Sequence, residues 1–219
     1  MSIQENLLKI KSTLPEHVTL VAVSKTKPIS DLMEAYNTGQ RIFGENKIQE
    51  MAEKHEQMPK DIEWHMIGHV QRNKVKYMAE FVSLIHGVES FKLLNEINKQ
   101  AQKHDRIIDC LLQIKIAEED SKFGMSAEDA SNLLKSNEFS ELKHIKVVGL
   151  MGMATFTDDT NQIKKEFKSL NHTFTELKQL HPELKTISMG MSGDYKLAID
   201  CGSTMIRVGS SIFGSRNYN

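Results

Sequence analysis

Lys25 is the residue of this sequence with the clearest potential for covalent chemistry. It follows the apolar run Val18–Ser24 and stands just before Pro28, and a short run rich in β-branched residues is typical of a buried parallel strand. Because side chains alternate along a strand, Val21, Val23 and Lys25 share one face. A desolvated amine at the mouth of a first barrel strand could bind a carbonyl ligand as a Schiff base. The alternative is a lysine that ends the strand and extends its amine into water.

Two segments near the C-terminal end have the composition of a phosphate cradle. Met189–Asp194 and Arg207–Gly214 each begin in the last residues of an expected strand and continue with glycine and serine residues that open a helical turn. Small residues leave backbone N–H groups accessible at a helix start, and serine hydroxyls add further donors. In barrels of alternating strands and helices, phosphate often binds after strands seven and eight. The two segments together therefore predict a phosphate site.

Arg207 lies within the last expected strand, where either of two faces could be buried. If Met205, Arg207 and Gly209 face the barrel interior, then Ile206 and Val208 face the helices. An inward guanidinium would need a partner, because an isolated buried charge costs several kcal/mol. A ligand heteroatom could supply that partner. The alternative is an outward guanidinium that pairs with a carboxylate between barrel and helices.

Asn46 comes just after the second expected strand, which ends in Phe43-Gly44-Glu45. At that place its amide could orient a ligand oxygen or the lysine amine. Asparagine is equally suited to cap the following helix, which the apolar pattern places at Glu45–Met58. Both roles remain open from the sequence.

The two histidines of the segment Trp64–His69 raise the question of a metal site. His65 and His69 lie four residues apart on an extended segment, a separation of roughly 13 Å, which is too far to share one ion. We expect a core and a rim histidine respectively, with His69 near the ligand. His86, at the end of the fourth strand, could be a rim group but is better explained as structural.

Strand-like and helix-like segments alternate along the whole chain, and this alternation defines the expected fold. The candidate strands are Val18–Ser24, Arg41–Gly44, Ile62–Gly68, Val82–Val88, Ile107–Ile116, Ile145–Ala154, Thr186–Gly190 and Met205–Gly209. The candidate helices between them are Ile29–Thr38, Glu45–Met58, Gln71–Ala79, Ser90–Lys103, Ala127–Ser136, Thr160–Leu180 and Asp194–Cys201. Such alternation predicts a parallel sheet with right-handed crossovers.

Eight repeats favour the α/β class and a single (β/α)8 TIM-type barrel over 1–219, with an open doubly wound sheet as the competing arrangement. Only Ser210–Asn219 follow the last strand, so the eighth helix must be short or absent. An extra N-terminal helix over Ser2–Thr13, with Ile3, Leu7 and Ile10 on one stripe, could cover that side.

Composition and missing motifs exclude several functions. Lys plus Arg number 28 against 29 Asp plus Glu, a balance that implies neither nucleic-acid nor membrane binding. Two distant cysteines, Cys110 and Cys201, fit a reducing cytosol rather than a disulfide scaffold or zinc site. The N-terminus has no signal-peptide core, so we expect a cytoplasmic protein. Neither nucleotide-binding glycine motifs nor a serine nucleophile elbow is present.

Taken together, these segments resemble the pyridoxal phosphate homeostasis protein family. The resemblance is carried in order by Val21-Ala-Val-Ser-Lys25-Thr-Lys, Phe43-Gly-Glu-Asn46, Trp64-His-Met-Ile-Gly-His-Val-Gln-Arg-Asn-Lys74, Ser188-Met-Gly-Met-Ser192 and Ile206-Arg-Val-Gly-Ser-Ser-Ile-Phe-Gly214. It spans nearly the whole chain, and the run from Trp64 to Lys74 is especially distinctive. Gly193 before Asp194 is a small departure that leaves the site intact.

The resemblance implies a barrel similar to the N-terminal domain of alanine racemase that holds pyridoxal 5′-phosphate (PLP). By motif position, the aldimine would form on Lys25 and Arg207 would face the pyridine nitrogen. Asn46 would lie near the lysine and the ring. The phosphate would be held by residues of both glycine-serine segments, namely Ser192, Gly209 and Ser210.

The implied activity is PLP supply in vitamin B6 homeostasis, without efficient catalysis. An arginine beside the ring nitrogen cannot accept its proton, which leaves carbanions poorly stabilised. Racemisation also needs acid/base groups on both faces of the substrate, and the sequence shows no added domain to supply them. The expected partners are PLP and apo forms of PLP-dependent enzymes, and a lone barrel is expected to be monomeric. The alternatives are a PLP-dependent amino-acid racemase and a cofactor-free barrel isomerase of a phosphorylated metabolite.

Overall fold

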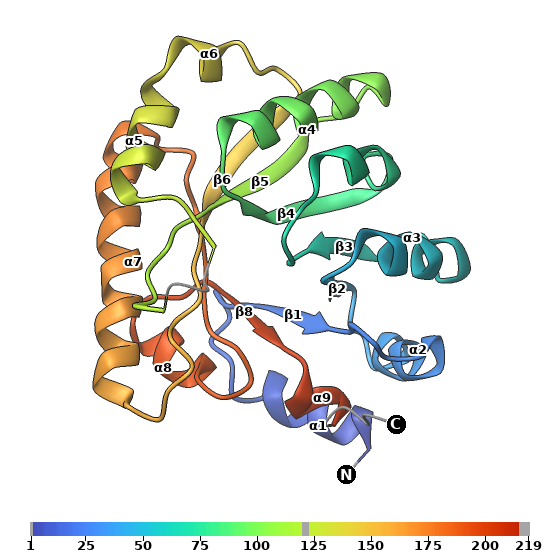
Figure 1. The fold of residues 1–219 in the computed structure, drawn as a ribbon. Helices are drawn as coiled ribbons and strands as arrows, with labels where there is room; N and C mark the ends of the chain where they lie inside the picture. The colour runs from blue at the N-terminus through green and yellow to red at the C-terminus, as the bar shows by residue number, and fades with distance from the viewer. Residues whose placement is uncertain (1, 120–122, 215–219) are drawn as a thin grey trace.

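Eight parallel strands close into a barrel in the computed structural model, which describes residues 2–119 and 123–214 (Figure 1). The strands are β1 (Thr19–Val23), β2 (Ile42–Glu45), β3 (Glu63–Met66), β4 (Val82–Val88), β5 (Ile108–Gln113), β6 (Ile145–Met151), β7 (Thr186–Ser188) and β8 (Met205–Val208). Each strand pairs with its neighbour in sequence, and β1 pairs with β8 to complete the ring. The predicted closed barrel is therefore confirmed, and the open sheet is excluded.

The helices surround the barrel, as the ribbon in Figure 1 shows. They are α1 (Ile3–Lys11), α2 (Ile29–Asn37), α3 (Ile48–Gln57), the 3-10 helix η1 (Arg72–Tyr77), α4 (Phe91–Lys103), α5 (Ala127–Lys135), α6 (Asn137–Ser140), α7 (Thr160–Leu180), α8 (Tyr195–Asp200) and α9 (Ser210–Phe213). Of these, the short α6 was not expected. Ser126 and Asp159 cap α5 and α7 through their side chains, as their positions before these helices predict.

Side-chain alternation divides the hydrophobic core into two layers. Val21 faces the barrel interior, where it packs with residues such as Leu111 and Met205. Leu20 and Ala22, the neighbours of Val21, belong instead to the larger layer between barrel and helices. Because the strands are buried on both faces, they are almost continuously apolar, which is why the sequence pattern identified them.

The N-terminal helix covers the side of the barrel where the outer ring is thinnest. Ser2 and Glu5 form a capping box at the start of α1, and Leu7 and Ile10 are buried beneath it. The Asn6 amide donates a hydrogen bond of 3.0 Å to the carbonyl of Ile212 in α9. α9 is a single short helix within the described residues, so α1 completes the layer as expected.

Two local predictions were wrong at their boundaries. The helix expected from Glu45 begins only at Ile48, because Glu45 is still part of β2 and fully buried. Lys47 occupies the N-cap position, so Asn46 does not cap α3. The segment expected as an α-helix over Gln71–Ala79 is the shorter 3-10 helix η1.

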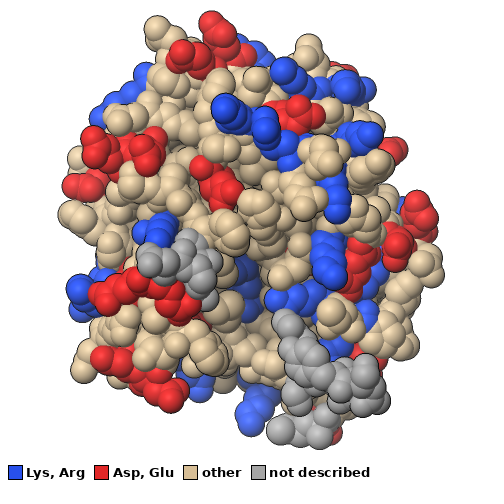
Figure 2. Space-filling model, viewed as in Figure 1, with Lys and Arg blue, Asp and Glu red and all other residues tan. Residues whose placement is uncertain are grey.

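Within the described residues, no helix has both the length and the apolar character needed to span a membrane. Acidic and basic side chains intermingle over the face of the molecule drawn in Figure 2.

Candidate functional site

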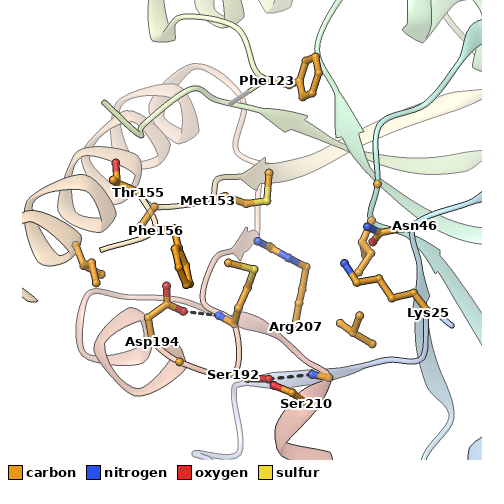
Figure 3. A pocket seen from close by; sticks show the side chains of 18 of the residues that line it. Lys25, Asn46, Phe123, Met153, Thr155, Phe156, Ser192, Asp194, Arg207 and Ser210 are labelled. Carbon is orange, nitrogen blue, oxygen red and sulfur yellow. Dashed lines mark hydrogen bonds between the residues drawn. The ribbon is translucent and has the colours of Figure 1, made fainter. Parts of the chain in front are cut away.

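A cavity of about 700 Å³ opens at the C-terminal ends of the barrel strands. Segments that follow β1, β2, β3, β5, β6, β7 and β8 line it, so it is built from residues far apart in sequence. The six residues predicted to bind a ligand all line this cavity: Lys25, Asn46, Ser192, Arg207, Gly209 and Ser210. Figure 3 shows the side chains of the five other than Gly209 around the shared space. The structure thus brings the six predicted residues together. That they bind a ligand stays a prediction.

Lys25 reaches the cavity from a turn rather than from the strand itself. β1 ends at Val23, and the half-buried Lys25 lies two residues further on. The shared face of Val21, Val23 and Lys25 is confirmed, because Val21 lies in the barrel interior while the other two line the cavity. Lys25 and Asn46 project toward the same part of the cavity in Figure 3.

Close backbone packing sets the position of Asn46. Its backbone lies against Gly68, where an added Cβ would come within 2.4 Å of the Asn46 carbonyl oxygen. A glycine is therefore required at residue 68 for the chain after β3 to approach the chain after β2 this closely. The half-buried Asn46 side chain borders the cavity beside Lys25.

Arg207 faces inward, which settles the choice that the sequence left open. Its guanidinium donates to the Ser188 carbonyl at 2.9 Å, the Ser188 hydroxyl at 2.6 Å and the Gly152 carbonyl at 3.1 Å. Burial lowers the pKa of Arg207 to about 10, although the nearby Asp194 carboxyl opposes this shift. Ile206 and Val208 pack toward the helices. The arginine therefore presents a fixed cation beside the cavity.

Behind Arg207, a chain of hydrogen bonds crosses the barrel interior. The Ser188 hydroxyl lies 3.0 Å from Nδ1 of His86, and Nε2 of His86 lies 3.1 Å from Nδ1 of His65. Burial lowers the pKa of His65 to about 3 and also lowers that of His86, so both rings are neutral at pH 7.

The Ser188 hydroxyl joins the arginine to this chain. A guanidinium only donates, so the Ser188 oxygen accepts from Arg207, and the direction of the Ser188–His86 and His86–His65 hydrogen bonds is set by the tautomers of the two rings. We call these three residues, Ser188, His86 and His65, the arginine relay.

The segments after β7 and β8 meet at the other end of the cavity. The Ser192 hydroxyl oxygen lies 3.2 Å from the backbone N of Gly209 and 3.4 Å from that of Ser211, and both N–H groups donate to it. A Cβ on Gly209 would lie only 3.0 Å from the Val23 carbonyl oxygen, so the residue closely abuts β1. Converging N–H groups and a hydroxyl are the donors that a phosphate requires, and an anion would replace the hydroxyl oxygen as their acceptor. This donor set fits a phosphate group.

Aromatic side chains border the mouth of the cavity. The Phe123 ring stacks on His69, with 4.9 Å between ring centroids, and Phe156 lines the opposite part with 93 % of its surface exposed. His69 lies in the cavity wall, and its expected place near a ligand stays a prediction. Residues 120–122, next to Phe123, are outside the described part of the chain.

Sequence reasoning missed the arginine relay. His65 was correctly expected in the core, and His86 proves structural rather than a rim residue because it is fully buried. Ser188 received no role at all. The only available signal was the presence of polar residues inside otherwise apolar strands, because their mutual contact depends on barrel closure. No cluster of three or more potential metal-ligating residues occurs among the described residues.

Comparison with known families first defines the class of protein. The family model described as alanine racemase, N-terminal domain, matches residues 1–217. An alanine racemase from Clostridium difficile superposes on the whole chain with a TM-score of 0.84 at 14% identity, and the chain covers 58% of that longer protein. At this identity the likeness establishes the barrel fold alone.

More similar relatives narrow the class to one family. A pyridoxal phosphate homeostasis protein from Pasteurella multocida is 38% identical over the full length of both chains. The structure of PipY from Synechococcus elongatus without PLP matches with a TM-score of 0.92 at 35% identity, covering 97% of this chain and all of PipY. PipY with PLP bound matches at 0.89 and 34% identity, with the same coverage. The chain belongs to the pyridoxal phosphate homeostasis protein family.

Proposed function

We propose that this protein binds pyridoxal 5′-phosphate in the barrel cavity and serves intracellular PLP homeostasis as a carrier rather than as an enzyme. The observation that carries the proposal is the convergence of a lysine amine, an arginine and a phosphate-type donor set on one cavity. Family membership and the PLP-bound structure of PipY support the same ligand.

The cavity offers one group for each functional part of PLP. Lys25 supplies a primary amine for the aldehyde, and Asn46 beside it supplies an amide that orients a neighbouring oxygen. Ser192, Gly209 and Ser210 supply hydroxyl and backbone donors for the phosphate. Lys25 and Asn46 lie in one part of the cavity wall and the phosphate donors lie in another, as a ligand bound at both ends requires.

Arg207 supplies the reason to expect weak catalysis. Bound PLP withdraws electrons from an attached amino acid most strongly when its ring nitrogen is protonated. Arg207 cannot accept a proton, and the two neutral histidines behind it add no charge, so a pyridine nitrogen placed beside the guanidinium would accept a hydrogen bond and would stay unprotonated. These residues favour holding the cofactor over activating a bound substrate.

An absorbance titration of the purified protein with PLP tests this proposal. We expect a visible band that borohydride converts into a stable pyridoxyl group on Lys25, located by mass spectrometry. Lys25→Ala should abolish the band, whereas Lys9→Ala, on the exposed surface of α1, should leave it unchanged. A protein that stays colourless with PLP would contradict the proposal and favour the cofactor-free isomerase.

Two further assays separate a carrier from a racemase. Release of PLP to an added apo-enzyme, measured by recovery of that enzyme's activity, supports the carrier. Rapid exchange of solvent deuterium into the α position of amino acids, with loss of stereochemistry, would instead support the racemase. Gel filtration tests the proposed monomer, and cell fractionation tests the proposed cytoplasmic location.

A further inference from the structure

A buried charged cluster lies directly behind the turn that carries Lys25. The Lys54 amine of α3 donates to Glu45 Oε1 at 2.8 Å, to Glu50 Oε1 at 2.7 Å and to the Ser24 carbonyl at 2.9 Å. All three ammonium protons thus have acceptors. The Ser24 hydroxyl also donates to Glu45 Oε1, at 2.6 Å. The residue before Lys25 is therefore bound through both its carbonyl and its side chain.

The residue after Lys25 is bound by the same cluster and has a strained backbone. Thr26 has φ of 63°, in the left-handed region, which is a genuine outlier for a β-branched residue. Its N–H donates to Glu50 Oε1 at 2.6 Å, the oxygen that also accepts from Lys54. Lys25 thus lies between two residues that α3 and the end of β2 hold from behind. Backbone strain of this kind persists only where the surroundings over-determine it.

Burying these charges carries a desolvation penalty that offsets much of their contribution to the stability of the fold. Glu45 is fully buried and Lys54 nearly so, and Glu45 Oε2 has no hydrogen-bond partner among the described residues. Burial raises the pKa of Glu45, while the adjacent Lys54 acts to lower it. Replacing a buried ion pair by apolar residues is often neutral or stabilising, so the charges themselves are poorly explained by stability. Their placement around one turn points to a positioning role.

We propose that Glu45, Glu50 and Lys54 are positioning residues that hold the turn 24–26 so that the Lys25 amine meets an aldehyde in the cavity. We call these three residues the lysine clamp. This inference rests on the proposed function, because it assigns the clamp a role only in bond formation at Lys25. None of the three clamp residues lines the cavity, so the clamp can act on a ligand there only through the turn that carries Lys25.

The test uses two ligands that differ only at the reacting carbon. PLP needs the Lys25 amine, whereas pyridoxine 5′-phosphate carries an alcohol in place of the aldehyde and binds through its ring and phosphate alone. We expect Glu50→Gln and Thr26→Gly to weaken PLP binding at least tenfold and to slow borohydride-trappable coupling. Their affinity for pyridoxine 5′-phosphate should stay within twofold of wild type. Asp61→Asn, which removes the exposed Arg41–Asp61 pair on the surface, is the matched control and should change neither affinity.

Each outcome decides between the two proposals. Equal loss of both ligands, or a loss of PLP binding that only follows a lower unfolding temperature of the ligand-free variant, would overturn the positioning role. Wild-type affinity in both variants would overturn it as well. If the wild-type protein itself forms no bond with PLP, the proposed function fails, and the role of the clamp fails with it.

Discussion

Lys25 and Arg207, two of the basic residues that line the cavity, are supported by opposite kinds of buried network. Lys25 stands on a turn and is backed by the lysine clamp, whose charged groups bind the neighbouring Ser24 and the strained Thr26. Arg207 stands within β8 and is backed by the arginine relay, in which both histidines are neutral. The backbone of a strand residue is already fixed by the barrel, so only the orientation of its side chain needs further support. A turn residue needs its backbone held as well.

The difference also separates the energetic roles of the two networks. The relay consists of uncharged side chains that are linked to Arg207 and to one another by hydrogen bonds. The clamp concentrates charge, and one carboxylate oxygen remains without a partner among the described residues. We therefore expect the clamp to tolerate removal of a partner less well than the relay.

The largest effect should follow from Lys54→Met. This substitution leaves the buried Glu45 carboxylate without its cation, and breaking a buried pair on one side costs about 3–5 kcal/mol. Urea unfolding at pH 7 measures the loss. The double variant Lys54→Met with Glu45→Gln should recover part of it, because the uncompensated charge is removed. A loss below about 1 kcal/mol in the single variant would show that the clamp is no more demanding than a surface pair.

A smaller loss should follow from Ser188→Ala in the relay. The substitution removes a hydroxyl that accepts from a charged guanidinium, a bond worth about 1.5–3 kcal/mol. The Arg207 backbone should remain in place because β8 keeps its pairing with β1. We expect a lower free energy of unfolding. We also expect a shifted absorbance maximum of bound PLP, because the guanidinium is less firmly oriented. An unchanged spectrum would indicate that the Ser188 and Gly152 carbonyls alone orient Arg207.

Acid should lower the free energy of unfolding through the buried histidine His65 of the relay. The folded-state pKa of His65, about 3, lies below its ordinary value of 6.5, so the unfolded chain binds the proton first. The stability from neutral His65 is thus complete above about pH 6.5 and is lost as pH falls toward 3, by about 2 kcal/mol at pH 5. Glu45 and Asp194, whose pKa values burial raises, act in the opposite direction.

The comparison that isolates His65 is therefore between wild type and His65→Gln, which cannot titrate there. Denaturant unfolding at pH 7 and pH 5 should show a shallower fall for the variant. If the free energy of unfolding falls equally between pH 7 and pH 5 in the two proteins, then burial does not lower the pKa of His65.

The smallest effect on stability should come from Thr26→Gly. Relief of the left-handed conformation favours the folded state, while the greater freedom of glycine in the unfolded chain opposes it. The two nearly cancel, so we expect a change within about 1 kcal/mol, measured by thermal unfolding without ligand. Together with the predicted loss of PLP affinity, this would separate positioning from stability. A large destabilisation would show instead that the Thr26 side chain supports the fold.

Local pattern was sufficient to predict the barrel and many of the residues that line its cavity. Apolar runs of strand length, alternating with helical stripes, predicted all eight strands, because strands buried on both faces are almost continuously apolar. The expected positions of Lys25, Asn46 and the two glycine-serine segments followed from a general rule, since parallel strands bring their C-terminal ends to the same rim.

The orientation of Arg207 and the partners of both networks were decided by the tertiary structure. Met205, Arg207 and their neighbours are consistent with either face of β8 until pairing with β1 and β7 sets the strand. The relay joins residues of β3, β4, β7 and β8, and the clamp joins a turn, a strand end and a helix. Sequence alone determines which residues reach the rim, because that depends on short-range periodicity. Which buried groups meet one another depends on barrel closure, which juxtaposes residues that no local pattern links.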